Sequence, residues 1–92
     1  MFNYSIDKIP ADILKEIAFK VRAIRKQKKY SQQELANRAK ISLGSYKRFE
    51  QTGQISFESL LQIAFVLGKL ADFESIFKLN GMEKIEKLFS EK

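Results

Sequence analysis

Ninety-two residues with a formal net charge of +6 are enough for one small domain with a single hydrophobic core, but not for two. The lack of cysteine excludes disulfides and cysteine-based zinc sites, and the lack of histidine removes the usual metal ligand and general base. We therefore expect neither a metal nor another cofactor. No apolar run approaches the roughly 18 residues of a membrane span, and the N-terminus MFNYSIDKIP lacks the basic-then-apolar order of a secretion signal. We expect a soluble, cytoplasmic protein with no membrane partner.

Positive charge is concentrated in one part of the chain. Residues 15–48 hold eleven of the seventeen Lys and Arg residues and two acidic residues, so this part carries +9 and the remainder −3. A basic half of this kind is typical of proteins that bind a polyanion. For Lys15 and Lys20, a solvated helix face explains the charge equally well. Phosphate contact is favoured for a cluster of four residues, namely Arg22, Lys26, Lys28 and Lys29.

The apolar spacing is helical throughout, and the chain has no strand pattern, repeat or low-complexity segment. Pro10 suits the first position of a helix that runs to about Lys28. The apolar stripe of this first helix consists of Ile13, Ile17, Val21 and Ile24.

Two short helical segments follow, only a few residues apart. Ser31 and Glu34 have the spacing of a capping box at the start of the first, 32–39, and Ser42 is placed to cap the second, 43–50. A short second helix held against the first, with a free outer face, is the arrangement of a helix-turn-helix that enters a DNA groove. The predicted inner contacts are Leu35, Ala36, Ala39, Ile41, Tyr46 and Phe49.

The remaining pattern predicts a fourth helix, which follows the motif, and then a helical extension. Gly68 can end a helix whose apolar positions are Phe57, Leu60, Leu61, Ala64 and Leu67. A helix over 71–78 and a last helix over 82–89 follow, separated by the break signal Asn80-Gly81. We therefore predict a single all-α domain over 1–92, with five or six helices. It comprises a helix-turn-helix core at 10–68, whose motif spans 31–53, and an extension at 69–92.

The segment 31–53 resembles the helix-turn-helix of the phage lambda repressor/Cro type, also called XRE-like. A downstream match at 56–68 extends the resemblance to about residues 17–77. The resemblance implies a lambda-repressor-like fold and sequence-specific binding of double-stranded DNA. The matching residues are Arg25, Ser31, Gln32, Glu34, Leu35, Ala36, Ile41, Ser42, Arg48, Phe49, Glu50 and Gly53.

The resemblance also implies roles for individual residues. Gln32 matches a glutamine that meets a DNA phosphate and often braces the recognition helix. Leu43 and Gly44 depart from the polar residues often found at their positions, so base readout is expected to rest on Ser45 and Lys47. Arg48 is expected either to reach a phosphate or to pair with an acidic neighbour. The complete set of expected DNA contacts is Gln32, Lys40, Ser42, Leu43, Gly44, Ser45, Lys47 and Arg48.

Two further features follow from the family pattern. Arg25 and Glu50 match a partly buried ion pair that locks the first helix to the motif, so we expect them to be structural. Lys29 and Lys40 stand where the family usually has glycine. If both have positive φ, each costs about 1 kcal/mol relative to glycine.

The leading functional hypothesis is a dimeric, DNA-binding transcriptional regulator, with repression as the favoured mode. Surplus apolar residues of the extension are assigned to a homodimer interface, although they could fold back onto the first helix: Phe73, Ile76, Phe77, Ile85, Leu88 and Phe89. The alternative is an antitoxin, similar to HipB-like antitoxins, that binds a toxin protein and represses its own operon; a neighbouring toxin gene would decide it. An enzyme is disfavoured because Glu34 and Glu50, the only carboxylates of the motif, already have structural explanations.

Overall fold

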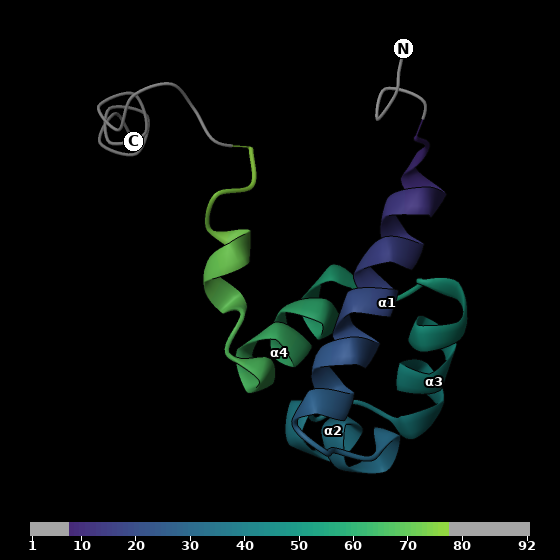
Figure 1. Ribbon diagram of the computed structural model, residues 1–92, viewed down its shortest axis with the longest axis vertical. Coiled ribbons are helices and arrows are strands. Elements are labelled where there is room, and N and C mark those ends of the chain that lie inside the picture. Colours follow the sequence, from purple (N-terminus) through teal and green to yellow (C-terminus); the bar gives the residue numbers. More distant parts are fainter. Residues whose placement is uncertain (1–7, 78–92) are drawn as a thin grey trace.

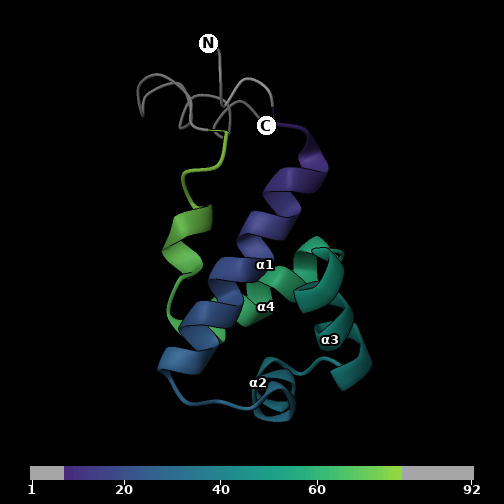
Figure 2. The same ribbon diagram turned by 45° about the vertical axis from the view of Figure 1, so that its right-hand side comes forward.

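The structure, a computed structural model, describes residues 8–77 (Figures 1 and 2). These residues form the helices α1 (Pro10–Gln27), α2 (Gln32–Ala39), α3 (Leu43–Thr52) and α4 (Phe57–Leu67), followed by a short 3-10 helix, η2 (Leu70–Phe73). Helix α1 packs on α3, and α2 packs on both α3 and α4. In both views α3 runs beside α1, and α2 lies near the end of α1 from which the chain leaves. The predicted all-α fold is confirmed.

Helices α2, α3 and α4 each begin after a serine that caps them. The hydroxyl oxygens of Ser31, Ser42 and Ser56 accept hydrogen bonds of 3.0 to 3.1 Å from the backbone N–H three residues further on. A cap of this type contributes about 1 kcal/mol. The predicted capping box at Ser31 is only half formed, because the Glu34 carboxylate accepts a hydrogen bond from Arg38 at 3.2 Å instead.

Helices α1 and α2 end at lysines in the left-handed conformation. Lys29 has φ 62° and Lys40 has φ 61°. The amide after each lysine donates back to the helix, to the carbonyl oxygens of Arg25 and Ala36, at 3.1 and 3.0 Å. This closure normally favours glycine, so each lysine costs about 1 kcal/mol. Both helices nevertheless stop sharply, which leaves short connections on either side of α2.

The hydrophobic core lies where the four α-helices meet. Tyr46, Phe49, Leu35 and Ile63 are its largest fully buried side chains. The inner contacts predicted for the motif are confirmed, with Ile41 partly rather than wholly buried. The apolar stripes predicted for the first and the fourth helix are only partly correct. Ile13 of the first stripe is 42% exposed, and the buried Ile63 was not among the positions predicted for the fourth.

Phe57 is also more exposed than predicted, at 58%. It is the first residue of α4 and lies at the edge of the core. Its ring packs edge-to-face on Phe73, with the ring centroids 5.9 Å apart. Phe73 itself packs against the core, so this residue connects the chain after α4 to it.

The segment after α4 differs from the prediction. The predicted helix over 71–78 is wrong within the described residues, which form η2 and a following turn. The bonds there span three residues, as in Ile76 N–H to the Phe73 carbonyl at 3.3 Å. An α-helix of about eight residues depends on tertiary packing, as α2 has against α3 and α4, and helical spacing alone does not provide it. The described residues therefore hold four α-helices, fewer than the five or six predicted for the whole chain, and the predicted helix over 82–89 lies outside them.

No helix within residues 8–77 combines the length and apolar character needed to cross a bilayer.

Gly53, at the end of α3, allows α3 to pack directly on α1. Its φ is +84°, and a Cβ at this position would lie 2.8 Å from the backbone carbonyl carbon of Leu14. Gly68 has a similar φ of +74°, but a Cβ there would meet nothing within 4 Å. Gly53→Ala therefore adds a clash with backbone to the strain of a left-handed alanine, whereas Gly68→Ala adds strain alone.

We expect Gly53→Ala to lower the free energy of unfolding by about 2–4 kcal/mol, and Gly68→Ala by about 1–2 kcal/mol. Urea denaturation of the two variants measures the difference. Equal losses would mean that the close approach of α1 and α3 at Gly53 does not limit the fold.

Candidate nucleic-acid interface

The outer face of α3 begins at a capped and open helix N-terminus. The Ser42 hydroxyl oxygen accepts from the Ser45 N–H at 3.0 Å and donates to the Ser45 hydroxyl at 2.9 Å. A Cβ added to Gly44 would meet nothing within 4 Å, so the backbone is accessible there. Leu43 is half-buried, whereas Gly44, Ser45 and Lys47 are exposed. This end of α3 therefore presents a polar surface on which the backbone at Gly44 is accessible.

The inner face of α3 keeps that surface pointing outward. Tyr46 and Phe49 are 0% and 1% exposed, and their rings meet edge-to-face with centroids 6.0 Å apart. Because side chains at i and i+3 share a helix face, burial of these two rings fixes the rotation of α3 about its axis. Lys47, which follows Tyr46, consequently lies on the exposed side.

Arg48 forms no ion pair with an acidic side chain among the described residues. Its guanidinium donates to the side-chain oxygen of Gln54 at 2.6 Å. The chain between them is held by Thr52, whose hydroxyl donates to the Arg48 carbonyl at 2.8 Å and accepts from the Gln54 N–H at 3.1 Å. Arg48 is exposed and keeps its charge at the surface. Gln54 was missed by the sequence reasoning, which considered only charged partners for Arg48.

A single carboxylate connects the first three helices. The Arg25 Nε of α1 donates to Oε2 of Glu50 in α3 at 2.7 Å, and a second guanidinium nitrogen donates to Oε1 at 3.3 Å. Gln32 of α2 donates through Nε2 to the same Oε1 at 2.9 Å, and the Tyr46 hydroxyl donates to Oε2. The Arg25 and Glu50 side chains are only 9% and 6% exposed. We call these four side chains the Glu50 network.

Electrostatics in the Glu50 network follow from burial and hydrogen bonding. Burial alone would raise the pKa of Glu50, but the hydrogen bonds from Arg25, Tyr46 and Gln32 outweigh it and lower that pKa below its usual range. Burial and the hydrogen bond to Glu50 raise the pKa of the Tyr46 phenol. The hydrogen bond to Glu50 also raises the pKa of Arg25. At neutral pH the network is therefore an ion pair with a neutral tyrosine.

Three side chains of the Glu50 network, Arg25, Gln32 and Glu50, line an open polar groove between α1, the start of α2 and α3. The groove has a volume of about 630 Å³. The first N–H groups of α2 are there, together with cationic side chains from the last turns of α1, so the groove suits an anionic group. Its lining residues are Arg22, Arg25, Lys26, Ser31, Gln32, Glu50 and Gln51.

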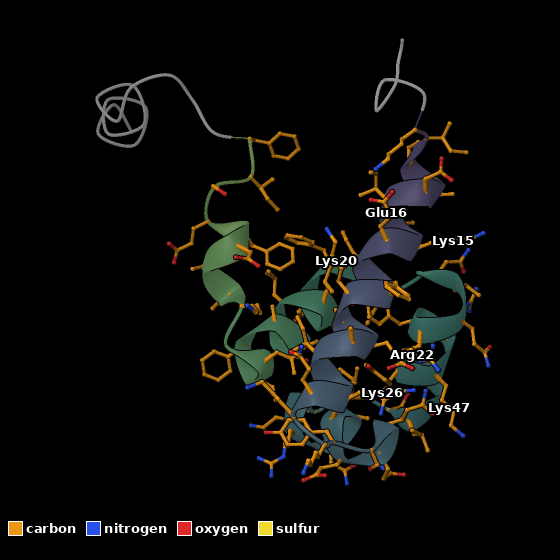
Figure 3. All side chains as sticks on the ribbon, viewed as in Figure 1. Lys15, Glu16, Lys20, Arg22, Lys26 and Lys47 are labelled. Atoms are coloured by element: carbon orange, nitrogen blue, oxygen red, sulfur yellow. The ribbon has the colours of Figure 1, made fainter. Side chains whose placement is uncertain are left out.

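Cationic side chains continue from this groove along the side of α1 that faces α3. Figure 3 shows Lys15, Arg22 and Lys26 on the edge of α1 that faces α3, with Lys47 of α3 on the same side. Lys20 points to the opposite edge of α1. The positive charge of residues 15–48 is thus partly gathered beside the outer face of α3.

The structure gathers seven of the eight predicted DNA-contact residues into two areas, and Arg48 lies further along α3. The first is the N-terminal half of α3 with the turn before it, where Lys40 is exposed at the end of α2. The second is the polar groove, which contains Gln32. Gln51 of this groove was missed, although it lies one turn after Lys47 on the outer face and the spacing could have indicated it.

Comparison with known proteins identifies the class to which this arrangement belongs. A family model described as Helix-turn-helix matches residues 21–73. The chain therefore belongs to the helix-turn-helix family of the lambda-repressor-like, XRE type, a family of DNA-binding regulators. Searches of curated proteins and of solved structures found no match. Within residues 8–77, no group of three or more acidic side chains is placed to hold a metal ion.

We expect Glu50→Ala to lower the free energy of unfolding by about 3 kcal/mol, because it leaves Arg25 buried without its counter-charge. Glu34→Ala breaks the other motif ion pair, Glu34–Arg38, whose side chains are 43% and 52% exposed. That control should cost at most about 1 kcal/mol. Denaturant melts of both variants provide the measurement, and equal losses would show that the Glu50 network does not hold the helices together.

Stability should also fall in acid because of Glu50. Since its folded-state pKa is lowered, its contribution is fully present above the unfolded-state pKa of about 4.3 and is lost as pH falls through the lower folded-state value. We therefore expect the thermal midpoint of the native protein to decrease below about pH 4 more steeply than that of Glu50→Gln. Parallel acid dependence in thermal melts of the two proteins would contradict this assignment.

Proposed function

We propose that the chain is a dimeric, sequence-specific regulator of transcription that binds double-stranded DNA, with repression as its favoured mode. The observation that supports this most directly is the position of α3. Burial of Tyr46 and Phe49 turns Gly44, Ser45 and Lys47 outward at an accessible helix end. The major groove is about 12 Å wide and admits one α-helix presented in this way.

Base recognition is assigned to the first turns of α3. Ser45 and Lys47 can form hydrogen bonds with base edges, and Leu43 can pack on a thymine methyl group. Gly44 lets the helix backbone approach the duplex closely, because no side chain separates them. With only two polar side chains to read bases, the sequence preference is expected to be modest.

Phosphate contacts are assigned to the edges of this surface. Gln32 lies in the polar groove at the start of α2, with Arg22 and Lys26 beside it. Lys40 and Arg48 are exposed on the other parts of the motif. These contacts would orient the protein on the duplex and provide affinity without sequence information.

Dimerisation is assigned to the chain after α4. Two half-sites one helical turn of DNA apart, about 34 Å, require two recognition helices in one assembly. Ile76 and Phe77 are 42% and 93% exposed, whereas Phe73 is partly buried against the core. Ile76 and Phe77 are therefore the residues of the assigned interface that are exposed in the described part of the chain, and Ile85, Leu88 and Phe89 are assigned to it from the sequence pattern. Phe73 packs against the core and so anchors this segment to the domain.

Lys47→Ala and Gln32→Ala should separate base recognition from phosphate contact. Lys47→Ala should weaken binding to a site selected from random duplexes by about tenfold or more, and binding to unselected DNA much less. Gln32→Ala should weaken both by a similar factor. Lys20→Ala is the matched control for Lys47→Ala. It also removes one lysine, but from the edge of α1 that faces away from α3 (Figure 3). Equal losses of Lys47→Ala on both DNAs, measured by fluorescence anisotropy, would assign Lys47 to the backbone.

Phe77→Ser should convert the dimer to a monomer with weaker specific binding, because it removes an exposed apolar contact without touching the core. Phe65→Ser is the control, since Phe65 of α4 is 71% exposed and lies outside the assigned interface. Light scattering of the intact protein and both variants gives the oligomeric state. A monomeric native protein at high micromolar concentration, or equal dissociation of both variants, would contradict the interface.

A further inference from the structure

The position of Gln32 is determined by its partner. Gln32 is the first residue of α2, and its side chain is half-buried in the polar groove. Its Nε2 donates to Glu50 Oε1 at 2.9 Å. A carboxylate can only accept hydrogen bonds, so the amide of Gln32 must turn its nitrogen, rather than its oxygen, toward Glu50. One of the two Nε2 hydrogens is used in this contact, and the second stays available to an acceptor in the groove.

The position of Glu50 is in turn determined by the core. The Tyr46 hydroxyl and Arg25 Nε both donate to Oε2, and the latter contact is 2.7 Å long. Tyr46 is fully buried, and its ring is held edge-to-face against Phe49. The hydroxyl therefore has little freedom, and the carboxylate that it holds has little either. Arg25 is fixed independently, because its other terminal nitrogen donates to the Tyr30 carbonyl at 2.8 Å.

We propose that Glu50 and Tyr46 are positioning residues for the DNA-phosphate contact of Gln32. Tyr46 holds the carboxylate, and the carboxylate orients the Gln32 amide so that a free N–H faces the groove between Arg22 and Gln51. This inference rests on the proposed function, since it needs a phosphate at that groove. It assigns to Glu50 a part in DNA affinity as well as its part in the fold.

Neutralising Arg25 does not by itself account for the Glu50 network. Two hydrogen bonds from the guanidinium already pair the carboxylate with its counter-ion. The bonds from Gln32 and Tyr46 bring α2 and the core of α3 to the same two oxygens. An amide that is already oriented loses less side-chain freedom when it binds, and this is the physical basis of the effect on affinity.

A double-mutant cycle on DNA affinity tests the proposal. Glu50→Gln keeps the shape of the side chain but can donate as well as accept, so it no longer dictates the orientation of Gln32. Glu34→Gln is the matched control, because it makes the same change in charge at an exposed pair on α2. Relative to Glu34→Gln, Glu50→Gln should weaken duplex binding about two- to tenfold when Gln32 is present, and should have no such effect in a Gln32→Ala background. The same loss in both backgrounds would overturn the proposal.

Tyr46→Phe provides a second variant, because it removes the hydroxyl and keeps the buried ring. If Glu50→Gln does not fold, the same double-mutant cycle is made with Tyr46→Phe. We expect a smaller loss of duplex affinity, which should again be absent in a Gln32→Ala background. The DNA-free protein gives an independent readout. The two side-chain amide protons of Gln32 should be further apart in NMR chemical shift than those of an exposed glutamine, because one of them is bonded to Glu50, and Glu50→Gln should reduce that extra separation.

An unchanged Gln32 amide spectrum in Glu50→Gln would overturn the positioning role whatever the protein binds. If Gln32→Ala binds DNA as tightly as the native protein does, this inference alone is overturned, and DNA binding by the protein still stands. Native protein that shows the amide signature but binds no duplex would contradict the proposed function itself, and with it the phosphate contact.

Discussion

The carboxylate of Glu50 is the constraint on which the arrangement of the first three helices depends. It accepts hydrogen bonds from Arg25 of α1, Gln32 of α2 and Tyr46 of α3, in a site where the two charged side chains are less than one-tenth exposed. Withdrawing two charges from water is costly, and the attraction between them compensates only when the geometry is good and the remaining lone pairs are satisfied. All of these donors meet at one carboxylate, so a displacement of any of the three helices disturbs the others. Close packing at Gly53 adds a second, purely steric connection between α1 and α3.

The contacts at Glu50 and Gly53 explain how so small a domain can hold the outer face of α3 in a fixed position. The short helices α2 and α3 would be unstable alone, because helices of this length recover little of the cost of nucleation. They are held by serine caps at their starts, by left-handed residues at their ends and by the two buried rings of α3. The left-handed lysines Lys29 and Lys40 cost stability at the ends of α1 and α2, while they keep positive charge beside the motif. The same contacts thus fix the arrangement of α1, α2 and α3 and leave the outer face of α3 exposed.

Much of the fold was predictable from local signals, and the parts that were not depend on contacts between distant residues. Serines followed by helical periodicity located the starts of α2 and α3, and the family pattern indicated that Arg25 and Glu50 would pair. The contact of Gln32 with Glu50 and the bond from Tyr46 were not predicted individually, because they require the directions of side chains from different helices. Phe57 fits a helical stripe by spacing, yet it lies at the first position of α4, outside the core. The segment at 71–77 has apolar residues at helical intervals, but spacing alone does not show whether so short a segment repays helix nucleation. Gln51 could have been found by extending the spacing of Lys47 by one turn.

Fluorescence anisotropy of a labelled duplex, titrated with the native protein over a series of salt concentrations, measures directly whether α3 and the groove beside it form a DNA-binding surface. If a dimer neutralises about six to ten phosphates, the logarithm of the affinity should fall linearly with the logarithm of the salt concentration, with a slope of roughly −5 to −9. An affinity that does not change with salt, or no binding at low salt, would contradict a role for this surface in binding DNA.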